Sequence, residues 1–222
     1  CIPNRLYNVP ERKNKLYLTY EGAPLVIAIP AAQYDADTFK LALETALRAA
    51  TLDNSCTVLI NSTTGEVILT YVVSFALGWT VLSHTAVKEQ YGVDESLNDI
   101  LGTGYDTQLA ASSYWVSPHI IDLSGEQMIR IESSTLAFSN SFDSRGQILN
   151  TVEVIPVTEP FGATIHYQPS DHILSFVDSG STGRQINSVD IQLVGDSGKQ
   201  LELPDNAYVE IVLLVIFRQG NF

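Results

Sequence analysis

The feature that most constrains the fold is the apolar run near the end of the chain, Tyr208–Phe217 (YVEIVLLVIF). Seven consecutive residues, Ile211–Phe217, carry no polar side chain, and five of these seven are β-branched or aromatic. The run is too short to span a bilayer as a helix, which takes about 20 apolar residues. It is typical of a strand buried on both faces, so we expect it to lie in the core of a sheet or sandwich.

Apolar or alternating runs bounded by turn residues recur along the whole chain and predict many more strands. These runs are Lys15–Tyr20, Pro24–Ile29, Cys56–Asn61, Glu66–Val72, Phe75–Leu82, Pro118–Leu123, Met128–Ser133, Gln147–Val157, Ala163–Tyr167, Ile173–Val177, Ser188–Val194 and Lys199–Leu203. Short polar turns predict hairpins at Ser62–Gly65, Ser124–Glu126 and Gly195–Gly198. Strands at this spacing indicate a β-sandwich rather than βαβ units.

One substantial helix interrupts the strands. Apolar residues at spacings of three and four, among them Phe39, Leu43 and Leu47, predict an amphipathic helix over 37–50. Either Asp35 or Asp37 can cap its first turn. A second, short helix is expected at Leu97–Leu101, with Ser96 before it and Gly102 after it. The polar stretch 102–113 predicts a long surface loop.

The length of 222 residues allows one large domain or two small ones. We expect an extended arm over 1–14, one β domain over 15–217 and a short tail over 218–222. Because the first residue is Cys1 rather than Met, we also expect a longer precursor or a removed start. With only Cys1 and Cys56 present, free thiols are expected rather than a disulfide framework.

The charge balance excludes one class of partner. Lys and Arg number 12 against 25 Asp and Glu, so the net charge is −13. Binding to a phosphate backbone requires a basic patch, so no direct nucleic-acid binding is expected. The densest basic cluster, Arg12, Lys13 and Lys15 beside Glu11, is interpreted as part of a solvated arm. No signal peptide and no membrane span are expected.

Residues suited to catalysis are present but form no recognisable pattern. The only local cluster of metal-ligand types is His166, Asp171, His172 and Asp178, which is most simply explained by polar strand ends. Among the carboxylates, nothing singles out a hydrolytic pair; those available are Glu126, Glu132, Asp143 and Glu153. We therefore predict no catalytic residues, no cofactor and no metal, although a sandwich hydrolase stays an alternative if such groups converge in a cleft.

Aromatic side chains in or beside predicted loops offer another route to function. They are Tyr7, Tyr91, Tyr105, Tyr114 and Trp115. Tyr and Trp are enriched at protein interfaces, and they also stack on sugars in lectin-like sandwiches. Ordinary half-buried aromatics are the third explanation.

The order of elements resembles that of known viral shell proteins. A strand pair leads into the helix begun by Tyr34-Asp35, followed by the Thr64-Gly65 hairpin and the Leu97–Gly102 element. The Ile120–Ser133 hairpin, Gly146–Leu149, Val154–Val157 and the closing strand complete the series. This layout is similar to the jelly-roll capsid proteins of polinton-like viruses, virophages and related double-stranded DNA viruses, especially their vertex or penton component.

The resemblance implies a single jelly-roll β-sandwich, mainly β, carrying one amphipathic helix and a decorating hairpin. It implies a virion protein assembled inside the host cell that contacts copies of itself, as in a homopentamer, and other capsid proteins. Residues of the two ends and of the loops are the candidate inter-subunit contacts: Ile2, Leu6, Tyr7, Tyr105, Tyr114, Trp115 and Phe222. The alternative function is a carbohydrate-binding or host-attachment module that uses the loop aromatics.

Overall fold

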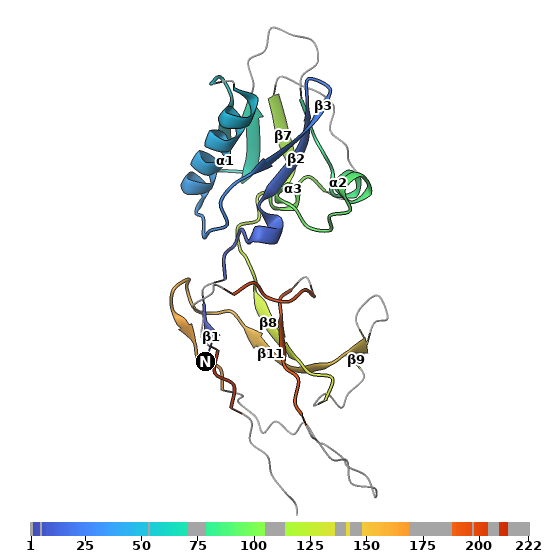
Figure 1. Ribbon diagram of the computed structural model, residues 1–222. Helices are drawn as coiled ribbons and strands as arrows, with labels where there is room; N and C mark the ends of the chain where they lie inside the picture. Colours follow the sequence, from blue (N-terminus) through green and yellow to red (C-terminus); the bar gives the residue numbers. More distant parts are fainter. Residues whose placement is uncertain are drawn as a thin grey trace, which may run out of the picture. The chain divides into compact units, whose positions relative to one another are not determined.

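The computed structural model divides the chain into two compact units, which are described separately (Figure 1). The terminal unit comprises Cys1–Leu6 and Glu126–Phe222, and the helical unit comprises Tyr7–Gly125. The structure describes residues 2–4, 6–52, 54–70, 79–104, 114–135, 141–142, 148–168, 188–196, 198–203 and 209–212. The single domain expected over 15–217 stays a prediction.

The helical unit contains two three-stranded antiparallel sheets. The first has the order β3-β2-β6, and its strands are β2 (Lys15–Tyr20), β3 (Ala23–Ala28) and β6 (Trp79–Val81). The second has the order β4-β5-β7, and its strands are β4 (Thr57–Ile60), β5 (Glu66–Thr70) and β7 (Tyr114–Ile120). The hairpin predicted around Ser62–Gly65 is therefore present. It is not a decoration, because the alternate side chains Val58, Val67 and Leu69 are fully buried in the core.

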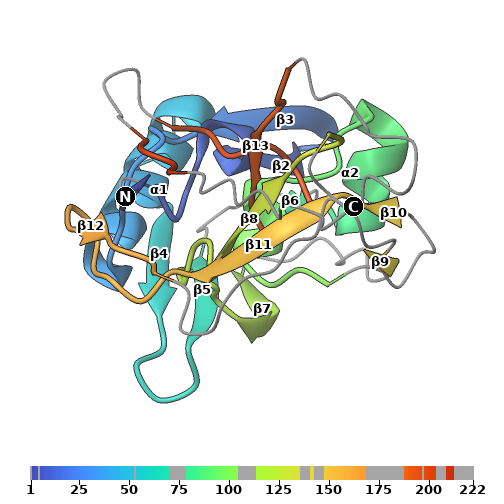
Figure 2. The ribbon, with the colours of Figure 1, turned by 90° about the horizontal axis from the view of Figure 1, so that it is seen from below.

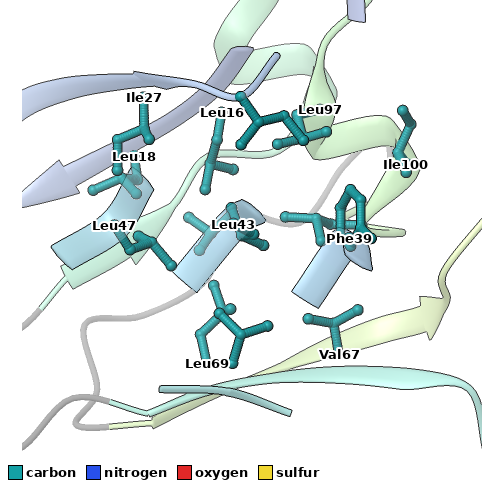
Figure 3. Close-up of a cluster of buried hydrophobic side chains, with 14 of the residues drawn as sticks. Leu16, Leu18, Ile27, Phe39, Leu43, Leu47, Val67, Leu69, Leu97 and Ile100 are labelled. Carbon is teal, nitrogen blue, oxygen red and sulfur yellow. The ribbon is translucent and has the colours of Figure 1, made fainter. Parts of the chain in front are cut away.

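Helix α1 (Ala36–Thr51) confirms the predicted amphipathic helix. The Asp35 carboxylate accepts a hydrogen bond from Thr38 N at 2.8 Å, and Thr38 Oγ1 accepts one from Asp35 N at 3.0 Å. These bonds satisfy donors that an uncapped first turn leaves unpaired. The bonds that the carboxylate accepts from the amide and the hydroxyl of Thr38 lower the pKa of Asp35. Leu43 lies between Leu69 of one sheet and Leu16 of the other, so the helix and both sheets share one core (Figure 3).

Two further helices follow β6. The predicted short helix is present as α3 (Leu97–Ile100), whose Leu97 and Ile100 enter the same core. The sequence analysis missed α2 (His84–Tyr91), although Ser83 caps its start and Gly92 ends it in the left-handed conformation. Its single buried residue, Val87, explains the weak hydrophobic pattern. None of the helices in the described part of the chain has the length and apolar character needed to cross a membrane.

The first residues of the helical unit are not part of a free arm. Val9 is fully buried and forms a β-bridge with Ala32. The Asn8 side chain donates to the carbonyls of Tyr34 and Leu123 at 2.8 and 2.9 Å and accepts from Tyr34 N. The sequence has no periodic apolar pattern here, and hydrogen bonds of the buried Asn8 amide hold this segment in place instead.

Arg12 of the basic cluster is held by a partner rather than solvated, whereas Lys15 is exposed. Glu11–Lys13 forms the 3-10 helix η1, and Arg12 Nε lies 2.7 Å from Glu95 Oε2 with both side chains largely buried. A charged pair in that environment is stabilised by direct hydrogen bonding, which sequence patterns do not reveal. The expectation of an extended, solvated arm is therefore wrong for Arg12.

In the terminal unit, β8 (Met128–Glu132) is the central strand of the sheet β11-β8-β13. Its neighbours are β11 (Thr151–Pro156) and β13 (Gln192–Val194), both antiparallel to it; Figure 2 shows β8 and β11 side by side. Two smaller pairs complete the described strands: β9 (Ser141–Phe142) with β10 (Ile148–Leu149), and β1 (Ile2–Pro3) with β12 (Thr164–Ile165).

Several predicted features of this part of the chain are corrected. The expected hairpin between Pro118–Leu123 and Met128–Ser133 does not form, because β7 pairs with β5 and β8 pairs with β11 and β13. The predicted strand Lys199–Leu203 is reduced to a single bridge between Val194 and Gln200. Apolar runs fix which residues become buried, but a strand also requires a hydrogen-bonded neighbour, which the local sequence does not specify.

Only residues 209–212 of the closing run Tyr208–Phe217 are described, and they are not in a strand. Val212 is 82% exposed, contrary to the expected burial on both faces. The rest of the run, the predicted strand Ile173–Val177, most of the loop 102–113 and the tail 218–222 lie outside the described residues. The described fold is mainly β, built of small antiparallel sheets, and is compatible with a β-sandwich; the jelly-roll topology stays a prediction.

Candidate protein-contact surface

The structure distributes the predicted contact residues unevenly. Ile2 and Leu6 are 2% and 7% exposed in the core of the terminal unit, packed in the same cluster as Ile129 and Ile155. Their surfaces are covered by their own chain, since the apolar residues near the start pair with β12 rather than project outward. Tyr105 and Phe222 lie outside the described residues.

The remaining candidates belong to the helical unit. Trp115 is 5% exposed and packs in the core, whereas its neighbour Tyr114 is 58% exposed on the other face of β7. Tyr7 is 36% exposed. Tyr91, one of the loop aromatics, packs against Tyr17 with their ring centroids 4.7 Å apart. Trp115 and Tyr91 therefore serve packing, and Tyr114 is the most exposed of the four.

Tyr114 lies on an apolar sheet face that the sequence analysis did not identify. In the sheet β4-β5-β7, Leu59 is paired with Ile68, and Ile68 with Val116. We call these three residues the outer row. They alternate with the buried residues Val58, Leu69 and Trp115, so they lie on the opposite face of the sheet. Leu59 is 48% exposed, Val116 is 37% exposed and Ile68 is half-buried.

A β-bulge at one end of the sheet extends this face. The register between β5 and β7 shifts between Glu66 and Ile68, and Val67 N donates to Ser117 Oγ at 2.9 Å instead of to a backbone carbonyl. The Ser117 hydroxyl in turn donates to His119 O at 2.7 Å. Beyond the bulge Ile120, which is 65% exposed, lies opposite Glu66. The bulge thus keeps an apolar side chain at the rim of the outer row.

The outer face is suited to binding another protein surface. Cross-strand apolar neighbours such as Leu59, Ile68 and Val116 form a continuous surface, with Tyr114 and Ile120 at its two ends. Contiguous exposed apolar patches are typical of protein interaction sites, because covering them removes apolar area from water. In these three strands the only acidic residue is Glu66, whose carboxylate accepts from Thr64 Oγ1 at 2.8 Å.

The outer row could have been suspected from sequence. The strands TVLI and EVILT are apolar at both odd and even positions, whereas a strand with one solvated face alternates apolar and polar residues. The sequence analysis predicted a hairpin here and made no prediction about the two faces of its strands. Sequence alone does not distinguish a strand covered on both faces by its own chain from one that leaves a face for a partner.

Titratable groups do not gather into a metal or catalytic centre in the described part of the chain, where no three His, Cys, Asp or Glu side chains are placed to hold a metal. His84 Nδ1 lies 2.8 Å from Asp99 Oδ1, and Asp99 also accepts from Ser96 N at 2.8 Å. This pair joins the starts of α2 and α3. His166 is exposed; its predicted companions Asp171, His172 and Asp178, and also Asp143, lie outside the described residues.

The other proposed carboxylates have structural neighbours of their own. Glu126 Oε2 accepts from Asp196 N at 2.7 Å, and Glu153 accepts from the Tyr167 hydroxyl at 3.3 Å. Glu132 lies 3.6 Å from Arg130 Nε. Cys56 is a buried free thiol, as expected, and Cys1 lies outside the described residues.

Comparison with known proteins gives a structural similarity of low strength. No family model matches the chain, and no curated protein matches it in sequence. Among solved structures, the crystal structure of the selenomethionine-labelled mavirus penton protein is similar, with 11% sequence identity and a TM-score of 0.39 over 93% of this chain and 82% of that one. A TM-score of this size is too low to assign a shared fold, so the proposals below depend on the residues of this chain.

Proposed function

We propose that the protein is a structural subunit of a viral capsid, located in the virion, that acts by assembling with copies of itself and catalyses no reaction. The observation that carries the proposal is the outer row. This sheet face presents the apolar residues Leu59, Ile68 and Val116, of which Leu59 and Val116 are exposed. A neighbouring copy that covers these residues accounts for their apolar character.

The proposal of a capsid role rests on the order of elements as well as on the outer row. The layout resembles the vertex proteins of virophages and related viruses, which implies a closed ring, a homopentamer, in contact with the major capsid protein. A ring forms when one surface of each copy binds a different surface of the next copy. The outer row supplies one such surface on the helical unit.

The test is the size of the purified protein and of two outer-row variants. We expect the wild-type chain to form a closed oligomer whose mass, measured by light scattering after size exclusion, is a multiple of the subunit mass of 24.3 kDa. Leu59→Lys and Val116→Lys each place a charge in the row and are expected to weaken assembly at least tenfold in concentration. Negative-stain images of the wild-type oligomer would give its symmetry.

Leu41→Lys is the matched control, because Leu41 is 66% exposed on the outer side of α1, away from the outer row. It should assemble as the wild type does. A wild-type protein that stays monomeric at every concentration would contradict the proposed function. Assembly that is equally strong in Leu59→Lys and Leu41→Lys would contradict the role of the outer row.

A further inference from the structure

The terminal unit has an open groove beside strand β13, whose outer edge is bonded to the chain's own residues 199–201. The groove has a volume of about 460 Å³, within the range of roughly 300–1,000 Å³ that is usual for binding pockets. Three short segments line the groove, and each contributes two apolar residues that are two positions apart in the sequence. The other two lining residues are glutamines. The lining residues are Ile191, Gln192, Leu193, Gln200, Leu201, Leu203, Val209 and Ile211.

The groove is continuous with the core of the unit. Leu201 is buried in that core, and Leu193, Leu203 and Val209 pack against it. Ile191 is 36% exposed at the rim. An apolar surface that opens directly from a hydrophobic core favours an apolar occupant, because such an occupant extends the burial that the core has begun.

The third wall shows how the chain leaves the groove. Val209 and Ile211 are half-buried and line it, whereas Glu210 and Val212 are exposed. This alternation is that of an extended segment with one face toward the groove. The chain therefore leaves the groove in extended form at Val212, which is 82% exposed.

The sequence beyond this point consists of strand-forming apolar residues. Leu213–Phe217 (LLVIF) lies outside the described residues, and no Gly, Pro, Asn or Asp occurs between Val209 and Gly220. Chain reversals rely on those residue types, so the sequence does not favour a return of Leu213–Phe217 into the groove that Ile211 has just left. An apolar segment of this kind is stabilised when another apolar surface covers it.

We propose that Leu213–Phe217 of one copy binds in the β13 groove of a second copy of this chain. The segment would lie in extended form along the groove, with alternate side chains against the apolar residues that line it. Each copy then donates one segment and accepts one, which is the head-to-tail contact that a closed ring needs. This inference rests on the proposed self-assembly and names the segment and the groove that would carry it.

The charges around the groove are consistent with this occupant. Glu202 and Glu210 alternate with the lining residues on two of its walls and are exposed, while the walls themselves are neutral. In the donated segment, five uncharged residues are followed directly by Arg218. The neutral part suits the groove, and the guanidinium suits its acidic surroundings.

A cysteine pair tests the contact directly. In a background carrying Cys1→Ser and Cys56→Ala, we combine Ile191→Cys with Val215→Cys and oxidise the full-length protein. We expect disulfide-linked dimers and larger species on a non-reducing gel. The control pair, Leu52→Cys with Val215→Cys, uses a residue that is 90% exposed and lies in the helical unit; it should stay monomeric. If the Ile191→Cys, Val215→Cys protein forms this disulfide only within single chains, the exchange between copies is wrong.

Complementation adds a readout that misfolding cannot imitate. Val215→Asp disables the donated segment and Ile191→Asp disables the groove, so we expect each variant alone to lose assembly. Mixed in equal amounts, they retain one working contact and should form a complex of two chains, about twice the mass of the 24.3 kDa subunit. Circular dichroism of each variant alone checks its fold.

The outcomes separate this inference from the proposed function. If the wild type assembles and Val215→Asp assembles as well as it does, the strand exchange is wrong and the capsid role stands. If the wild type itself stays monomeric, both are wrong. Formation of the two-chain complex only on mixing supports both.

Discussion

The side-chain amide of Asn98 is paired with the backbone of Tyr17 as a strand residue would be. Asn98 Oδ1 accepts from Tyr17 N and Nδ2 donates to Tyr17 O, both at 2.8 Å, and Nδ2 also donates to Leu82 O at 2.8 Å. Asn98 is fully buried. Through this one residue α3 holds β2 beside the residue that follows β6.

Asn98→Ala should therefore destabilise the helical unit strongly. The substitution leaves Tyr17 N and Leu82 O without their side-chain partner in a buried site, whereas Tyr17 O keeps the bond from Leu82 N at 3.2 Å. Each unpaired group costs about 1–3 kcal/mol. We expect the free energy of unfolding to fall by roughly 2–4 kcal/mol, measured by urea denaturation. Asn150→Ala is the control, because Asn150 is exposed and its recorded bond is made by the backbone carbonyl; an equal loss in both variants would contradict this role.

Asp190 should make the stability of the terminal unit depend on pH. Its carboxylate accepts hydrogen bonds from the hydroxyls and amides of Ser134 and Thr135, with Ser134 N and Thr135 N both at 3.0 Å. The side-chain bond from Thr135 is the main cause that lowers the pKa of Asp190 well below its ordinary value of 3.8. Because the folded-state pKa is the lower one, this stabilisation is complete above about pH 4 to 5 and is lost as the pH falls toward the folded-state pKa.

Thermal melting of the wild type and of Asp190→Asn between pH 3 and pH 7 measures this effect. We expect the variant to melt at a lower temperature at pH 7 and the difference to shrink toward pH 3. A difference that stays constant over the whole range would show that the charge of Asp190 contributes nothing.

Gly102 and Gly22 offer a matched pair for testing how closely α3 approaches β7. Both have positive φ, +71° and +80°, so alanine is strained at either position by about 1–2 kcal/mol. At Gly102 an added Cβ would lie 2.8 Å from His119 O, whereas at Gly22 nothing lies within 4 Å. We expect Gly102→Ala to lose about 1–3 kcal/mol more stability in urea than Gly22→Ala. Equal losses would mean that the strand moves away without cost.

Ser117→Ala tests the bulge that keeps Ile120 at the rim of the outer row. The hydroxyl of Ser117, which is 2% exposed, is the hydrogen-bond partner of Val67 N, so its removal leaves a buried donor unpaired. We expect a loss of about 1–3 kcal/mol in the free energy of unfolding, and weaker assembly where the sheet end has moved. Ser62→Ala, in the exposed turn between β4 and β5, should change neither quantity.

Local patterns predicted the elements whose determinants are local. Helix α1 followed from the spacing of Phe39, Leu43 and Leu47 and from Asp35 before them, and the β4-β5 hairpin followed from Ser62–Gly65 between two apolar runs. The packing of the residues before Lys15 could not be predicted in this way, because Asn8 and Arg12 bind partners far away in the chain, namely Leu123 and Glu95. Such contacts leave no period in the sequence.

The sequence by itself determined that the chain is mainly β, that it has one long amphipathic helix and that its charge does not suit nucleic acid. These properties depend on composition and on spacings of two or three to four residues. Only the tertiary structure decided that Trp115 is buried while Val116 faces outward, and that Val209 packs against a core while Val212 is exposed. An apolar side chain favours burial wherever it lies, and strand pairing between distant segments decides whether its own chain or a partner provides the cover.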